Sequence, residues 1–193
     1  MADKITLTRQ ALLHLGSDSL LESFSEESKE AKVANIFFED AKRASLRDYN
    51  WNFATSEKPL ALYGTANGEY LYQYKYPNNC VKARKIVSPI PDLDIPFKVG
   101  SDGGVQVIKT NQEQAVLEYT EDVEISQVID ASFLEAFTLK LALMLVMPLS
   151  ANASLLDRLE QRYQRALFKA ETNDANEGQA EEQPVPDWIK SRF

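Results

Sequence analysis

The sequence contains very few of the side chains on which covalent and metal chemistry usually depends. It has one cysteine, Cys80, and one histidine, His14, among 193 residues. A single cysteine forms no internal disulfide, so the chain does not depend on an oxidising compartment. Because the two residues are far apart in sequence, they provide no recognisable Cys/His nucleophile pair and no zinc ligand set. We therefore expect no catalytic residue, no metal site and no cofactor.

Positive charge is also scarce. The 21 Lys and Arg residues are outnumbered by 29 Asp and Glu residues, which gives a net charge of -8 and a pI near 4.8. Proteins that grip the DNA backbone need clustered basic side chains to displace counterions, so tight DNA binding is disfavoured, while passing contact with duplex DNA is not. The first residues also lack the basic segment and apolar core of a signal peptide, so we expect the protein to stay where it is made.

Helical periodicity is present in the first quarter of the chain. Residues 6–15 carry leucines and alanine at helical spacing, and Gly16 stands where a left-handed residue would close a helix. A second helix is predicted after Ser25 or Ser28, either of which is a suitable N-cap. Small residues along one stripe of this helix let another helix approach closely. The stripe consists of Ala31, Ala34, Phe38, Ala41 and Ser45.

The third predicted helix is apolar nearly all round. It begins at Asp130 or Ser132, and Ser132 and Glu135 have the spacing of a capping box. Residues 133–147 are almost all apolar, as in a helix that is buried on most sides or spans a membrane. Glu135 and Lys140 interrupt the run, which is shorter than the roughly 20 residues needed to cross a bilayer. We therefore predict the central core helix and no membrane contact.

Pro148 is predicted to end or kink that helix. A fourth helix restarts at Ser150 or Asn152 with one apolar face, and its opposite face is charged. A charged helix face is typical of a solvated or subunit-facing surface. The candidate subunit-interface charges on this face are Asp157, Arg158, Arg162 and Arg165.

Between the helical segments the period changes to that of strands. An aromatic corner of Tyr49, Trp51 and Phe53 follows the second helix, and rings at such a position fill the seam between two kinds of structure. Tyrosines alternate with other residues over 70–76, which predicts a strand packed in a sheet or at a subunit contact. A glycine-rich turn between two short apolar runs marks a hairpin. We expect a small antiparallel β-module over residues 56–125.

The last segment, residues 173–193, is acidic and lacks large apolar side chains until its tip, which predicts a flexible arm. The tip contains Trp188, Ile189, Arg192 and Phe193. Aromatic and Arg side chains are frequent anchors of protein interfaces, so we predict that the tip docks onto a partner rather than forming an idle tail.

Together these patterns predict an α+β fold. Residues 1–55 and 126–172 are expected to form one helical bundle built from N- and C-terminal helix pairs. The antiparallel β-module of residues 56–125 would be inserted between the pairs, and residues 173–193 would extend from the bundle as an arm.

Four segments carry a family pattern in this order, together with the alanine-spaced second helix and the broken continuation of the third helix through Tyr163. They are residues 11–16 (Ala-Leu-Leu-His-Leu-Gly), residues 48–54 (Asp-Tyr-Asn-Trp-Asn-Phe-Ala), the apolar run 133–149, and residues 187–192 (Asp-Trp-Ile-Lys-Ser-Arg). In these segments the chain resembles the head-to-tail adaptor, or tail tubular, proteins of tailed bacteriophages, and the resemblance extends over most of its length.

The resemblance implies a non-enzymatic virion protein. Members of that family form a ring, usually a dodecamer, on the portal protein, with tail nozzle or tail tube proteins below. Such a connector joins the capsid to the tail and forms part of the DNA conduit, where it contacts duplex DNA in passing and without sequence specificity. The arm that carries Trp188 and Phe193 would reach the portal. The protein would be made in the host cytoplasm and be located at the portal vertex of the virion.

Two other functions stay open at this point. A virion-associated peptidoglycan hydrolase is one, since some adaptor-like tail proteins have that activity; it would need two carboxylates that face each other across a groove. A helical interaction adaptor unrelated to phage is the other. It would be favoured if the chain stayed monomeric with every candidate partner.

Overall fold

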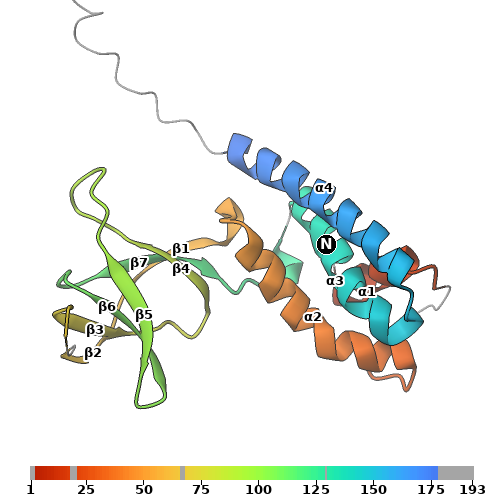
Figure 1. The fold of residues 1–193 in the computed structure, drawn as a ribbon, viewed down its shortest axis with the longest axis horizontal. Helices are drawn as coiled ribbons and strands as arrows, with labels where there is room; N and C mark the ends of the chain where they lie inside the picture. Colours follow the sequence, from red (N-terminus) through yellow and green to blue (C-terminus); the bar gives the residue numbers. More distant parts are fainter. Residues whose placement is uncertain (1–2, 18–20, 66–67, 129, 178–193) are drawn as a thin grey trace, which may run out of the picture.

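The fold is α+β, with helices gathered at one end of the molecule and strands at the other (Figure 1). The computed structural model describes residues 3–17, 21–65, 68–128 and 130–177. Within these ranges the chain forms four α-helices and two antiparallel sheets, and each end has its own hydrophobic core.

The first two helices have the caps that their sequences predict. Helix α1 (Lys4–His14) ends in a Schellman motif, in which Gly16 has φ 73° and its N–H donates to the Leu13 carbonyl at 3.0 Å. Helix α2 (Lys29–Asp48) is capped by Ser28, whose hydroxyl accepts the N–H of Ala31 at 3.2 Å. The predicted small-residue stripe of α2 is buried, as expected: Ala31, Ala34, Phe38, Ala41 and Ser45.

Helix α3 (Ala131–Ser150) is the centre of the helical core. Its length and composition alone would let it cross a membrane. In the fold, however, it packs against α1, against α2 and against α4 (Ala153–Glu177). Four of its large side chains are enclosed by these helices: Phe133, Phe137, Leu141 and Leu145 are all fully buried. A helix that is apolar all round buries its surface in this way when other helices surround it.

The break between α3 and α4 lies beyond Pro148, where the sequence predicted an end or a kink. Helix α3 includes Pro148 and continues to Ser150. The chain then reverses at Ala151, which has a left-handed φ of 50°. Asn152 opens α4, because its side-chain oxygen accepts the N–H of Leu155 at 3.1 Å. Helix α4 also runs five residues past position 172, where the arm was predicted to begin.

The predicted bundle of N- and C-terminal helix pairs is wrong. Most helical residues lie in α3 and α4, after the sheets. Helices α1 and α2 do not form a pair, since they hardly contact each other and each packs on α3 instead. The apolar period of α1 or α2 identifies which face is buried but not the partner that covers it, and α3 offers apolar surface on every side.

The strands form two sheets where one module was predicted. The first sheet has the order β1-β7-β4 and the second the order β2-β3-β6-β5, and every pairing is antiparallel. The strands are β1 (Thr55–Pro59), β2 (Leu62–Thr65), β3 (Tyr72–Lys75), β4 (Cys80–Ile86), β5 (Phe97–Asp102), β6 (Val105–Thr110) and β7 (Val116–Glu121).

The second hydrophobic core lies between these two sheets. Tyr74 and Ile108 come from the four-stranded sheet, whereas Ile86, Leu117 and Tyr119 come from the three-stranded one. The hydroxyl of Tyr74 donates to the Gln112 carbonyl at 2.8 Å, so its polar end is satisfied. At least this tyrosine of the alternating row is therefore a packing residue of the sheet.

Candidate assembly interface

The aromatic corner connects the two ends of the molecule. Helix α2 stops at Asp48, and a short 3-10 turn (η1, Asn52–Ala54) leads directly into β1. Trp51 is fully buried in this turn region, with its ring centroid 5.1 Å from that of Tyr49 and 5.1 Å from that of Phe133 on α3. Phe53 lies 4.9 Å from the same Phe133 ring. The predicted corner residues thus share one cluster anchored on the core helix.

Hydrogen bonds fix Trp51 at both of its polar groups. The indole Nε1 donates to the carbonyl of Ser45, in the last turns of α2, at 2.9 Å. The Trp51 carbonyl accepts from the Thr55 hydroxyl at 2.8 Å and from Nη2 of Arg84 at 3.0 Å. The bond of the indole is buried and those of the carbonyl are half-buried, and together they define one arrangement of the corner.

Arg84 joins the corner to the three-stranded sheet. It lies on β4 and donates from Nε to the Thr120 hydroxyl on β7 at 2.9 Å, and from Nη1 to the Thr55 hydroxyl on β1 at 2.6 Å. Together with the bond to the Trp51 carbonyl, one guanidinium thus ties all three strands to the segment that follows α2. Nothing in the sequence indicated this role, because Arg84 appears there as one of several cations in an alternating strand.

Asp174 completes the corner from the end of α4. Its carboxylate accepts the backbone N–H of Asn52 at 3.0 Å, and the side-chain amide of Asn52 donates to the Asp174 carbonyl at 2.7 Å. Asp174 is only 2% exposed, and this burial raises the pKa of its carboxyl against the opposing effect of the Asn52 bond. The assignment of Asp174 to a flexible arm is therefore wrong, because the residue caps the corner.

A polar cluster holds α2, α3 and α4 together next to the corner. The hydroxyl of Tyr163 on α4 donates to the carboxylate of Asp48 at the end of α2. Lys140 on α3 donates to the same carboxylate at 3.1 Å, with its ammonium 4.7 Å from the Tyr163 ring centroid. Burial and this hydrogen bond both raise the pKa of Tyr163, so the phenol stays protonated and remains a donor.

A second charged cluster ties α2 to the segment after β7. Lys42 is 4% exposed, and its ammonium lies 2.8 Å from Asp122 and 3.0 Å from Glu39. Arg43 adds a bond to Asp122 at 2.8 Å. Burial would raise the pKa of Asp122, but the hydrogen bonds and charges of Lys42 and Arg43 outweigh it and lower that pKa.

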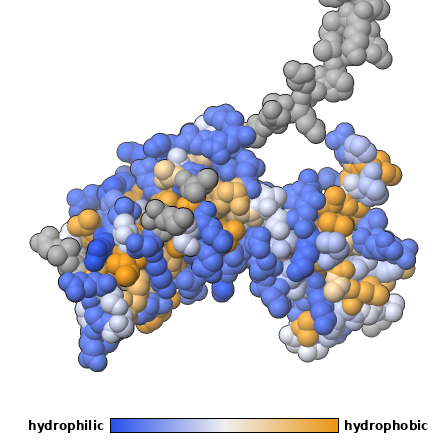
Figure 2. Space-filling view, turned by 180° about the vertical axis from the view of Figure 1, so that it is seen from behind, coloured by the Kyte–Doolittle hydropathy of each residue, from blue (hydrophilic) through white to orange (hydrophobic). Residues whose placement is uncertain are grey.

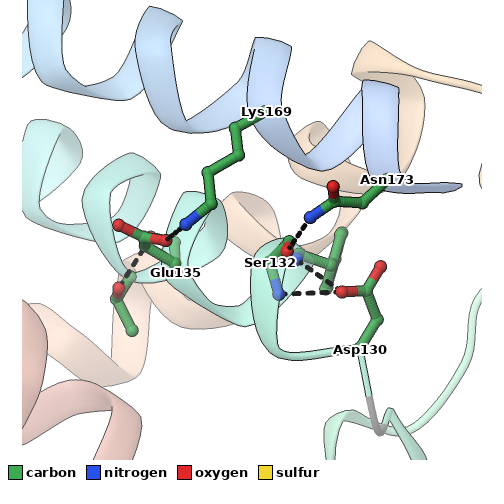
Figure 3. A network of polar contacts seen from close by, with 7 residues as sticks. Asp130, Ser132, Glu135, Lys169 and Asn173 are labelled. Carbon is green, nitrogen blue, oxygen red and sulfur yellow. Dashed lines mark hydrogen bonds and ion pairs between the residues drawn. The ribbon is translucent and has the colours of Figure 1, made fainter.

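The start of α3 differs from the predicted capping box (Figure 3). Asp130 is the N-cap, and its carboxylate accepts the N–H of Ser132 at 2.8 Å. Ser132 accepts instead from the side-chain amide of Asn173 at 2.7 Å, and Glu135 pairs with Lys169 at 3.1 Å. Residues in the last turns of α4 therefore bind both side chains, Ser132 and Glu135, that the predicted capping box would have used.

The predicted interface charges all lie on the exposed side of α4. Asp157, Arg158, Arg162 and Arg165 are exposed, and within the described residues none of them forms an ion pair. Arg158 contacts only the backbone carbonyl of Ser154, at 3.2 Å. These side chains are available to a partner. The predicted anchors of the arm, Trp188, Ile189, Arg192 and Phe193, lie outside the described residues.

Large apolar side chains are exposed on the outer faces of the helices. Ile36 on α2 is 66% exposed and Phe168 on α4 is 72% exposed. Leu13 on α1 and Met147 on α3 are also exposed. In the view from behind, apolar residues gather both over the helical end and over the sheets (Figure 2). Contiguous apolar patches mark surfaces that bind other proteins, whereas single exposed apolar side chains occur on most protein surfaces.

Helices α1 and α3 also border a groove of about 520 Å³. Its walls include Leu7, Leu13 and His14 from α1 and Leu134 and Glu135 from α3. Burial lowers the pKa of His14, and the positive charge of Arg162 lowers it further, so the imidazole tends to be neutral. In the part of the chain that the structure describes, no three His, Cys, Asp or Glu side chains are grouped to hold a metal ion.

No family model matches the chain, and a search of curated proteins finds no match either.

Proposed function

We propose that this protein is the head-to-tail connector of a tailed-phage virion, which assembles as a ring on the portal protein and joins the capsid to the tail. The proposal rests on the resemblance in the four sequence segments and on one feature of the helical end. That feature is the pair of outward faces on α2 and α4, each of which carries one large exposed apolar side chain, Ile36 or Phe168.

The two faces suit contacts between neighbouring subunits of a ring. A ring requires two different surfaces on each subunit, so that one face of a subunit meets the other face of the next. Helices α2 and α4 each pack mainly on α3 and leave their outer faces uncovered. Each face carries charges of both signs: Asp157 and Arg165 are exposed on α4, and Asp40 and Arg43 are exposed on α2. Charges of both signs can form complementary pairs across a head-to-tail contact.

The overall charge fits a passive lining of the DNA conduit. A net charge of -8 repels a phosphate backbone, so duplex DNA can pass such a protein without being held. The tight corner around Trp51 would fix the angle between the α2 and α4 faces and the two sheets, and a closed ring needs the same angle in every subunit.

Electron microscopy of the pure protein mixed with the matching portal tests this function directly. We expect ring-shaped particles seated on the portal, with tail nozzle or tail tube proteins binding the opposite side. Particles of bare portal at saturating protein would refute the proposal.

A pair of variants links the ring to the helical faces. Phe168→Asp should abolish ring formation and leave the melting temperature unchanged, because the side chain is 72% exposed in the subunit. Leu62→Asp is the matched control, since Leu62 on β2 is 62% exposed but belongs to neither face. Rings formed equally by both variants would show that the α4 face is not the contact.

A further inference from the structure

The groove between α1 and α3 lacks an occupant in the described part of the chain. Its volume of about 520 Å³ lies in the range of sites that hold large side chains or small ligands. Leu13, on its rim, is 65% exposed. Leu134 on α3 lines the groove as well and is only half-buried. Apolar area of this kind is stabilised when another apolar group covers it.

The chain leaves the described residues beside this groove. Asn173, one turn before the end of α4, donates to Ser132 at the start of α3 at 2.7 Å. One turn earlier, Lys169 pairs with Glu135 at 3.1 Å (Figure 3). Glu135 is itself a wall residue of the groove. The segment that follows Glu177 therefore starts close to the α3 turns that form the groove.

The remaining segment is long enough to reach the groove of its own chain. Ten residues, 178–187, lie between Glu177 and Trp188. Fully extended they span at most about 33–36 Å. Packed helices such as α3 and α4 have axes about 8–10 Å apart, so the path across α3 uses only part of that length.

Charge along the path matches that of the segment. Arg162, Arg165 and Lys169 line a hollow of about 210 Å³ between α3 and α4, and Glu135 forms part of its wall as well as of the groove wall. Glu181 and Glu182 occupy the first part of the segment, and the apolar residues come after them. In this order the carboxylates would meet the basic hollow and the rings would meet the groove.

We propose that residues 185–193 dock in the α1–α3 groove of the same chain, with Trp188 and Ile189 as the apolar anchors. Docking within one chain is favoured over docking between chains, because a short tether gives the tip an effective concentration in the millimolar range. The groove thereby covers the tip in the free subunit. Docking of the tip in the groove does not depend on the proposed connector function. Only the release of the tip to a portal rests on that function.

Photo-crosslinking in the full-length protein locates the tip. A photoreactive phenylalanine derivative in place of Leu13 should crosslink to a peptide within residues 184–193, as identified by mass spectrometry. The same group in place of Leu62, which is 62% exposed on β2, should not. No crosslink from position 13, or equal crosslinking from both positions, would overturn the proposal.

Isotope mixing separates the two possible sources of the tip. In an equimolar mixture of labelled and unlabelled chains, docking within a chain gives crosslinked peptides of one label only. Crosslinks that join the two labels would show that the tip comes from a second copy, and the proposal would then be wrong.

Fluorescence quenching provides a readout that needs no crosslinker. Trp51 is fully buried, so quenching by acrylamide reports on Trp188, the other tryptophan of the chain. We expect weak quenching in the intact protein and severalfold stronger quenching in Leu13→Glu, with Leu62→Glu behaving like wild type. Quenching in the intact protein as strong as that of free tryptophan would overturn the docking, whatever the protein does with a portal.

Discussion

The backbone N–H of Asn52 donates to the carboxylate of Asp174 at 3.0 Å, although 122 residues separate them in sequence. Asn52 belongs to the turn between α2 and β1, and Asp174 to the last turns of α4. The bond is half-buried: Asp174 is only 2% exposed, whereas Asn52 lies at the surface. The end of α4 is therefore part of the connection between the helices and the sheets.

Replacing Asp174 with asparagine should change how stability depends on pH. The pKa of Asp174 is raised above its ordinary value of 3.8 by burial, so the folded state binds the proton more tightly than the unfolded state. Stability from this group is therefore greatest below about pH 3.8 and declines as the pH rises through the folded pKa. We expect the free energy of unfolding of the Asp174→Asn variant to lack this decline. Urea unfolding at a series of buffers from about pH 4 to about pH 7 measures it. Parallel curves for variant and wild type would contradict the assignment.

Trp51→Ala should destabilise the fold by about 3–5 kcal/mol, as is typical for removing a large buried ring. The variant loses the ring contacts with Tyr49 and Phe133 and the bond to the Ser45 carbonyl. Trp51→Phe keeps a ring in the cluster and should lose less. Denaturant unfolding measures both. An unchanged midpoint for Trp51→Ala would show that the corner contributes little.

Arg84→Lys should lower the free energy of unfolding by about 1–3 kcal/mol. The planar guanidinium donates to Thr55, Thr120 and the Trp51 carbonyl at once, and a lysine ammonium cannot reach all three acceptors. Amide hydrogen exchange should also accelerate in β1 and β7, which the guanidinium joins. Lys85→Met on the same strand is the control, since the Lys85 side chain is 60% exposed and pairs only with Glu118. A loss of stability as large in the control would leave Arg84 without a special role.

Asp122→Asn should destabilise the protein by about 1–3 kcal/mol at neutral pH, because buried Lys42 loses its closest anionic partner. The pKa of Asp122 is lowered, so its stabilising contribution is present above the ordinary value of 3.8 and is lost as the pH falls through the folded pKa. The difference between variant and wild type should therefore shrink in acid. Glu135→Gln, which breaks the exposed pair with Lys169, should lower the free energy of unfolding by only about 0–1 kcal/mol.

Trp188→Ala combined with Phe193→Ala should weaken attachment to the portal by a few kcal/mol, as expected when two aromatic anchors are removed. The helical content should stay the same, because the described helices and strands all end before both positions. Sedimentation of the variant with the portal gives the loss directly. Wild-type affinity in the double variant would exclude the tip as an anchor.

Local elements of this fold follow from the sequence, but their partners do not. Gly16 and Ser28 mark helix ends because a left-handed residue and a side-chain acceptor satisfy backbone groups within a few positions. The predicted pairing of α1 with α2 was wrong, since the apolar stripe of α2 is equally suited to packing on α1 or on α3. Which of them covers it depends on packing across more than 80 residues of intervening chain, a scale about that of a small domain.

The candidate interface likewise contains residues that the sequence identifies and residues that it does not. The rings at Tyr49, Trp51 and Phe53 could be identified because their size and spacing indicate a packed seam. Arg84 and Asp174 could not, because each is one of many charged residues and its partner comes from a distant segment. The spacing of Ser132 and Glu135 even predicted the wrong bonds, since Asn173 and Lys169 compete for both side chains.

The central position of α3 has a consequence for synthesis on the ribosome. Helix α2 ends at Asp48 and α3 begins at Ala131, so about 80 residues are translated between them, which takes roughly 4–16 s at 5–20 residues per second. During that interval Phe38 lacks the Phe137 ring that packs 5.2 Å from it in the finished protein. The nascent chain therefore presents an uncovered apolar helix to chaperones until the second half of the protein emerges.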